Sequence, residues 1–235
     1  MLILALDSTA VVASVALCEN GRALAAFHLN NGNTHSETLL PMVKAALTTT
    51  GHTVDDVDLF ACSVGPGSFT GVRIGAATIK GLAFGKQKPV IGVSTLEALA
   101  TNLLPFEGLI VPVMNARRGQ VYNAVFEGRD GRLIRLTEDR ALAVTELEAE
   151  LAAMGRPFAL CGDGAEMTAG LLREITPTAV SPLLLSQNAV SVAEVALAAY
   201  ESGVRTTDAE LAPVYLRLPQ AERERLEREK QNSSI

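Results

Sequence analysis

The first group of residues that could carry chemistry is Asp7-Ser8-Thr9, which follows the apolar residues 2–6. A carboxylate at a strand end can order a magnesium ion, and the backbone N–H groups of a following hairpin can cradle a phosphate. A structural interpretation is also open, in which Asp7 and Thr9 satisfy the polar backbone groups of the hairpin. Ser8 and Ala10 flank Thr9 where close approach of a phosphate favours glycine, so the residues alone leave both interpretations standing.

Two glycine-rich turns follow apolar segments and precede predicted helices, at residues 65–71 (GPGSFTG) and 161–166 (CGDGAE). Such turns are frequent anion sites. The first lacks the Lys and the Ser or Thr that end a phosphate-binding P-loop. In the second, an ordinary turn in which Asp163 caps the helix is a sufficient explanation. Arg117 and Arg118 could contact an anion or RNA, or could form a solvated turn.

The side chains that could hold a soft metal ion are three histidines and three cysteines: His28, His35, His52, Cys18, Cys62 and Cys161. Their spacing matches neither a zinc site nor a disulfide framework. We therefore expect free thiols, no metal cofactor and a reducing, cytoplasmic location. Because Lys80 interrupts the longest apolar stretch, no transmembrane span is expected.

The composition predicts a packed α/β protein with little affinity of its own for nucleic acid. Of 235 residues, 48% are hydrophobic and only 4% aromatic, which favours a core of aliphatic side chains. The formal net charge of -6 argues against a dominant phosphate-binding face. If RNA is the substrate, another protein must hold most of it.

The order of predicted elements occurs twice along the chain, which indicates a duplicated βββαβα architecture. In the first round, three strands in residues 2–30 precede a helix at 34–50, a strand at 57–64, a helix at 69–85, a strand at 89–94 and a helix at 96–103. In the second, strands at 108–115, 120–128 and 132–137 precede a helix at 145–154, a strand at 158–162, and helices at 164–174 and 191–201. In the helix at 34–50, Thr34 and Glu37 form a capping box, and Pro41 predicts a kink or a late start near Thr38.

The repeat divides the chain into lobes 1–104 and 105–235. The helix at 191–201 could pack back on the first lobe. The tail at 220–235 carries closely spaced acidic and basic residues, which are typical of a solvated, frayed helix.

One face of the predicted helix at 69–85 carries mostly glycine and few large side chains. Gly71, Gly75, Thr78, Leu82 and Gly85 fall on one side of it. A second apolar face adjoins this stripe and consists of Val72, Ala76, Ile79 and Ala83. Glycine stripes let another helix approach closely, so the stripe predicts either packing inside its own lobe or contact with another polypeptide.

Three segments together resemble the TsaB (YeaZ) family: the opening LALDST, the long string from SVGPGSFTGVRIG to VIGVSTLEALA, and NARRGQVY. The resemblance implies an actin-like (ASKHA) fold with two ribonuclease H-like lobes. It also implies a non-catalytic subunit that binds TsaD, the enzyme that transfers threonylcarbamoyl to N6 of the adenosine next to the tRNA anticodon. The implied further partners are the small ATPase TsaE, a second copy of the chain when TsaD is absent, and tRNA contacted mainly through the other subunits.

Residues that the related enzymes use for chemistry are replaced here. When the two sequences are aligned at Gly92 and Val93, the two metal-binding histidines of TsaD correspond to Thr95 and Leu99. Neither of these side chains can bind a metal ion as an imidazole does. In the motif NARRGQVY, Asn115 stands where the family usually has Asp, so a second carboxylate is missing.

The resemblance also implies a partner interface on the helices at 34–50 and 69–85. Its predicted residues are His35, Leu39, Leu40, Val43, Phe69, Gly71, Val72, Gly75, Ala76, Thr78, Ile79 and Leu82. Asp7, Ser8 and Thr9 are the residues of a vestigial nucleotide site, with no cofactor required. Two alternatives remain: an actin-like ATPase or phosphotransferase that uses Asp7, and a metal-dependent hydrolase related to the glycoproteases.

Overall fold

The first lobe is built on a five-stranded sheet in the computed structural model, which describes residues 1–104 and 106–217. The strand order is β3-β2-β1-β4-β5, with β1 antiparallel to β2 and parallel to β4. The strands are β1 (Leu2–Asp7), β2 (Ala13–Glu19), β3 (Arg22–Leu29), β4 (Leu59–Gly65) and β5 (Val90–Ser94). This is the predicted first round, and it places Asp7 and Gly65 at the same end of neighbouring parallel strands.

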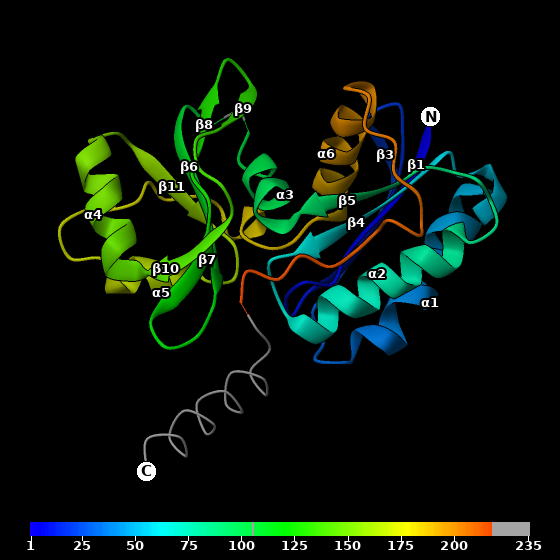
Figure 1. Cartoon of the computed structure of the whole chain (residues 1–235), viewed down its shortest axis with the longest axis horizontal. Coiled ribbons are helices and arrows are strands. Elements are labelled where there is room, and N and C mark those ends of the chain that lie inside the picture. Colours follow the sequence, from blue (N-terminus) through cyan, green and yellow to red (C-terminus); the bar gives the residue numbers. More distant parts are fainter. Residues whose placement is uncertain (105, 218–235) are drawn as a thin grey trace, which may run out of the picture.

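Helices cover both faces of this sheet, as the strand sequences require (Figure 1). Because side chains alternate along a strand, Leu4 and Leu6 point to one face while Ile3 and Ala5 point to the other. The first face is covered by the adjacent helices α1 (His35–Thr50) and α2 (Phe69–Ala83). The second face is covered by α6 (Ala189–Glu201), with α3 (Thr95–Thr101) beside it.

The helix starts follow local capping chemistry. The predicted capping box of Thr34 and Glu37 opens α1, which runs continuously from His35 through Pro41 and so does not start at Thr38. Ser68 caps α2 by accepting a hydrogen bond from the backbone of Gly71.

The second lobe has a six-stranded sheet in which β6 (Gly108–Asn115) is central. On one side it pairs with β11 (Phe158–Cys161), and on the other with β7 (Gln120–Asn123) and β8 (Phe126–Arg129) in one unbroken antiparallel register. The predicted single strand at 120–128 is therefore interrupted only at Ala124 and Val125. The outer strands are β9 (Arg132–Arg135) and β10 (Arg140–Ala143), and β10 was not predicted. The helices are α4 (Val144–Met154) and α5 (Ala165–Leu171), and two short 3-10 turns occur at Val54–Asp56 and Pro182–Leu184.

A C-terminal strap, residues 204–217, returns from α6 along the edge of α2 to the space between the two sheets (Figure 1). Val90 donates its backbone N–H to Thr206 (2.9 Å), and Val214 donates to Val64 (2.7 Å). Lys80 of α2 donates to the carbonyl of Leu211 (3.0 Å), whose side chain is buried. The strap is thus bonded to the first lobe along its length. The predicted charged tail at 220–235 lies outside the described residues.

The two lobes are joined by a polar network around Arg135. Its guanidinium donates to Asp139 (2.6 Å) and to Glu97 of α3 (2.9 Å), and it lies 4.6 Å from the centre of the Phe126 ring. Asp139 also accepts from Ser94 at the end of β5 (2.5 Å). Side chains of the second lobe are therefore fixed to the first turn of a first-lobe helix.

We expect Arg135→Met to lower the free energy of unfolding by about 2 kcal/mol, because it leaves two partly buried carboxylates without their shared cation. The measurement is urea denaturation of the variant beside Arg132→Met, an exposed arginine of the same strand. Equal stabilities of the two variants would show that the network contributes nothing.

All three cysteines are buried, and none of them forms a disulfide among the described residues. Among residues 1–104 and 106–217, none of the helices combines the length and the apolar character needed to cross a bilayer.

Candidate functional site

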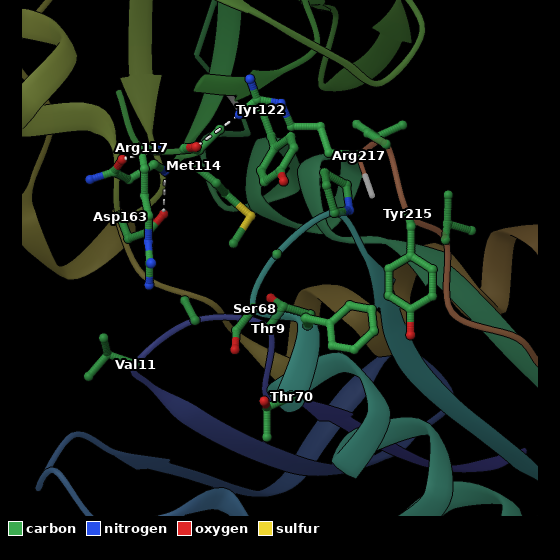
Figure 2. Close-up of a pocket in the computed structure, with 18 residues that line it drawn as sticks. Thr9, Val11, Ser68, Thr70, Met114, Arg117, Tyr122, Asp163, Tyr215 and Arg217 are labelled. Carbon is green, nitrogen blue, oxygen red and sulfur yellow. Dashed lines mark hydrogen bonds between the residues drawn. The ribbon is translucent and has the colours of Figure 1, made fainter. Parts of the chain in front are cut away.

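A cleft of about 530 Å³ lies between the two lobes (Figure 2). The β1–β2 hairpin, the glycine-rich loop before α2, the end of β6 and the strap all contribute to its walls. The lining residues are Thr9, Ala10, Val11, Pro66, Gly67, Ser68, Phe69, Thr70, Met114, Asn115, Ala116, Arg117, Tyr122, Asp163, Val214, Tyr215, Leu216 and Arg217. In Figure 2, Tyr215 and Arg217 lie across the cleft from Arg117 and Asp163.

Asp7 lies beneath this cleft and does not line it. Its carboxylate accepts hydrogen bonds from the backbone N–H of Thr9 (2.8 Å), the hydroxyl of Thr9 (2.7 Å) and the hydroxyl of Ser63. Burial raises the pKa of Asp7 above its ordinary value, against the effect of these hydrogen bonds. A buried carboxylate whose oxygens already accept three hydrogen bonds does not fit the role of a magnesium ligand.

The other two residues of the predicted nucleotide site have different surroundings. Thr9 reaches the cleft, but its hydroxyl is bonded to Asp7. Ser8 points away from the cleft and donates to the carbonyl of Gly71 in α2 (2.9 Å). The three residues therefore connect the hairpin to β4 and α2, which agrees with the structural interpretation of the motif.

Among the described residues that line the cleft, Asp163 is the one with a carboxyl side chain. The interpretation in which it caps the helix is not supported, because the N-cap of α5 is Gly164 and no side-chain cap is present. Asp163 instead accepts from the backbone N–H of Asn115 (3.4 Å). Burial raises the pKa of Asp163, and the negative charge of Asp7 raises it further. Within residues 1–104 and 106–217, the lining of the cleft thus contains one carboxyl group, and the buried Asp7 carboxyl group is close enough to affect its pKa.

The cleft also contains cationic and aromatic side chains that sequence reasoning did not single out. Arg217 of the strap donates to the carbonyl of Ala116 in the second lobe (3.0 Å), which closes one end of the cleft. Tyr122 and Tyr215 contribute rings to the lining. No local spacing marks these residues, because they come together only through the path of the strap.

Arg117 and Arg118 form the tip of the β6–β7 hairpin, where both have a left-handed backbone. The side chain of Asn115 accepts from the backbone N–H of Arg117 (2.8 Å) and stabilises this turn. Of the two arginines, only Arg117 lines the cleft.

The positions that align with metal-binding histidines lie in the core. Thr95 and Leu99 are on α3 and are fully or almost fully buried, Leu99 against residues of the second lobe. Within the described ranges, no three His, Cys, Asp or Glu side chains are grouped so that they could hold a metal ion. The residues present therefore do not fit the metal of a hydrolase.

The predicted partner interface is divided between the inside and the outside of the first lobe. Seven of its residues are buried in their own lobe: Leu39, Val43, Gly71, Val72, Gly75, Ala76 and Ile79. His35 is half-buried and its Nε2 lies 2.7 Å from the carbonyl oxygen of Ala10. Phe69, Thr78 and Leu82 are half-buried, and Leu40 is 53% exposed.

The first two glycines of the stripe, Gly71 and Gly75, face inward, which corrects their interpretation as partner-surface residues, whereas Gly85 follows α2 and is exposed. A Cβ atom on Gly71 would overlap the carbonyl oxygen of Ser8, and one on Gly75 would lie 2.6 Å from the Ser8 hydroxyl and 3.2 Å from Leu6. These glycines allow α2 to approach the end of β1 closely. At Gly71 and Gly75 the structure therefore supports the interpretation of packing inside the lobe.

The outer sides of α1 and α2 form a different surface, which we call the helix-pair face. Its exposed residues are Glu37, Leu40, Pro41, Lys44 and Thr48 on α1, and Thr70, Arg73, Ala77, Gly81 and the terminal Phe84 on α2. A Cβ on Gly81 would meet no atom within 4 Å, so this part of α2 is open. Phe84 is 78% exposed, an unusual position for a large apolar side chain.

Comparison with known proteins places this architecture in a family. The family model described as TsaD, tRNA N6-adenosine threonylcarbamoyltransferase, matches residues 30–224. The tRNA threonylcarbamoyladenosine biosynthesis protein TsaB of Bacillus subtilis is 30% identical over 230 residues, which are 98% of this chain and all of that protein. TsaB of Escherichia coli is 38% identical over 149 residues, 63% of this chain and 64% of that protein.

A solved structure extends the similarity to three dimensions. YeaZ from Pseudomonas aeruginosa superimposes with a TM-score of 0.79 at 29% identity, covering 92% of this chain and 99% of that one. The predicted α/β fold, here with two sheets, is thereby confirmed as the fold of YeaZ. From its full-length similarity to a relative and from its shared fold, the chain belongs to the TsaB family of tRNA threonylcarbamoyladenosine biosynthesis proteins.

Proposed function

We propose that this chain is a non-catalytic subunit that binds a transferase of the TsaD type through the helix-pair face and holds it for threonylcarbamoyl transfer to tRNA adenosine. The observation that carries the proposal is that two adjacent helices leave large apolar side chains exposed, Leu40 of α1 at 53% and Phe84 at the C-cap of α2 at 78%. Surfaces of this kind mark contact sites of proteins. Membership of a family named for threonylcarbamoyladenosine biosynthesis supports the choice of partner.

The site geometry supports a role without chemistry. The Asp7 carboxylate is held by Thr9 and Ser63, and positions 95 and 99 are buried in the core. The described residues thus give no support to an ATPase that uses Asp7 or to a metal-dependent hydrolase. In this proposal the transferase supplies the reacting groups and no cofactor is required by this chain.

The remaining partners follow from the same role. A second copy of the chain would occupy the helix-pair face when the transferase is absent, because the same exposed apolar groups need cover. TsaE would join the assembled complex, and tRNA would be held mainly by the other subunits because this chain carries a net charge of -6. The place of action would be the cytoplasm.

The test is Ala77→Arg, which places a charge in the middle of the α2 side of the face. We expect complex formation with TsaD to weaken by at least about 100-fold, since an unpaired charge would be buried on docking. The measurements are the Kd by titration calorimetry and tRNA modification in a reconstituted reaction. The isolated variant should keep its stability to within about 0.5 kcal/mol, because residue 77 is exposed.

The matched control is Ala198→Arg, the same substitution on the exposed side of α6. It should bind TsaD like the unchanged chain. If Ala77→Arg binds equally well, the helix-pair face is not the docking surface. If the unchanged chain does not bind TsaD, the proposed function itself fails.

A further inference from the structure

Arg73 of α2 stands where the helix-pair face meets the strap, and its guanidinium is held in one orientation by two aromatic rings. The guanidinium carbon lies 3.7 Å from the centre of the Phe69 ring. Its Nε donates to the hydroxyl of Tyr215 (2.8 Å), and the Phe69 and Tyr215 rings are themselves in contact, with centres 4.7 Å apart. This exposed arginine is therefore ordered by contacts from its own helix and from the strap.

In this orientation, the terminal nitrogens of the Arg73 guanidinium remain available for a further contact. A guanidinium has five N–H donors in a planar fork, and the bond to Tyr215 uses only the one on Nε. Within residues 1–104 and 106–217, the ion pairs involve other cations, and no carboxylate pairs with Arg73. The two terminal nitrogens can thus receive a carboxylate in the bidentate geometry that arginine favours.

From these contacts we infer that Arg73 is an anchor for an acidic side chain, Asp or Glu, of the protein that docks on the helix-pair face. The inference rests on the proposed function, and it adds the chemistry that the partner must present. Ala77 lies one helical turn after Arg73, and the guanidinium lies over Phe69 one turn before it, so the anchor lies on the N-terminal side of Ala77 on the same helix. Because the rings already restrict the side chain, little further entropy is lost when it pairs.

A carboxylate of a protein fits this position better than an RNA phosphate. RNA binding needs several cations on one face, whereas the helix-pair face carries Arg73 and Lys44 beside Glu37 on a chain of net charge -6. Arginine is instead one of the residue types that are enriched in protein–protein hot spots.

The test compares three variants of the full chain for binding to TsaD by titration calorimetry. Arg73→Met should weaken the Kd by at least about tenfold and make it less dependent on salt, because a charged pair is lost. Tyr215→Phe should weaken it by about threefold, since the ring remains but the bond that orders the guanidinium is gone. Arg22→Met, the same substitution at the exposed first residue of β3 in the same lobe, should have no effect.

The outcomes separate this inference from the proposed function. If Ala77→Arg abolishes binding while Arg73→Met leaves the Kd and its salt dependence unchanged, docking stands and the anchor is refuted. If Arg73→Met leaves assembly intact and instead weakens binding of tRNA to the complex, the ligand is a phosphate and the inference is also refuted. A partner Asp→Arg or Glu→Arg change that restores binding to Arg73→Glu would identify the pair directly.

Discussion

Asp7→Ala is expected to lower the free energy of unfolding by about 3 kcal/mol, as measured by urea denaturation. Three donors converge on the buried carboxylate: the backbone N–H of Thr9, the Thr9 hydroxyl and the Ser63 hydroxyl. Alanine removes their acceptor and leaves them unpaired in a site closed to water. The loss is moderated because the cost of burying a carboxylate disappears with it.

Asp7→Asn is the control that separates the hydrogen bonds from the charge. The amide oxygen can accept from the backbone of Thr9, and the amide nitrogen can donate to the Ser63 hydroxyl after that group rotates. We therefore expect a loss below about 1.5 kcal/mol. A loss as large as that of Asp7→Ala would show that the negative charge, and not the hydrogen bonding, is what the site requires.

The difference in stability between the unchanged chain and Asp7→Asn should depend on pH with a definite sign. Burial raises the pKa of Asp7 in the folded chain above the ordinary 3.8. Its titration therefore contributes stability that is fully present below the unfolded pKa and is lost as pH rises through the folded pKa. The stability of the unchanged chain relative to Asp7→Asn should fall as the pH rises from 3.8 to the raised folded pKa of Asp7. A difference that grows over this interval would contradict the assignment.

These variants also decide how an ATPase hypothesis has to be tested. Loss of any nucleotide turnover in Asp7→Ala would not identify a catalytic carboxylate, because the same change removes the support of the hairpin and of Ser63. Asp7→Asn keeps that support and removes only the charge. Turnover abolished in Asp7→Asn with a normal unfolding curve would be the evidence for catalysis.

Local patterns were sufficient to predict most of the elements. Alternating apolar residues predicted the strands, and the Thr34–Glu37 capping box predicted the start of α1. The glycine-rich loop before α2 and the polar turn after β1 were also located correctly. Each of these signals depends on residues within a few positions of one another.

Features that depend on distant residues were missed. Helical spacing shows that Gly71 and Gly75 share a face with each other, but it does not show that this face meets Ser8. The strap brings Tyr215 and Arg217 to the cleft through bonds to Val64 and Ala116, and no local pattern encodes that path. Asp163 was a candidate helix cap because it precedes a helix in the sequence. Its actual donor, the backbone N–H of Asn115, belongs to another strand, so no local pattern indicates it.

Gly71→Ala is expected to lower the free energy of unfolding by at least about 3 kcal/mol, measured by the same denaturation experiment. The added methyl group would overlap the carbonyl oxygen of Ser8, and it would also approach the ring of His35 at 3.4 Å. The backbone of Ser8 cannot withdraw easily, because its residue bonds to α2 and its neighbours Asp7 and Thr9 are bonded to each other. The change should therefore separate α2 from the end of β1.

Gly81→Ala is the matched control, since it is the same substitution on the same helix. Its Cβ meets nothing within 4 Å, and alanine has the higher helix propensity, so the chain should gain about 0.5–1 kcal/mol. Opposite signs at these two positions would establish which side of α2 faces the lobe. Equal signs would refute the packing described here. If the signs are opposite, assembly defects in variants of Gly71 or Gly75 follow from misfolding. Only substitutions on the outer side, such as Ala77→Arg, can then report on docking.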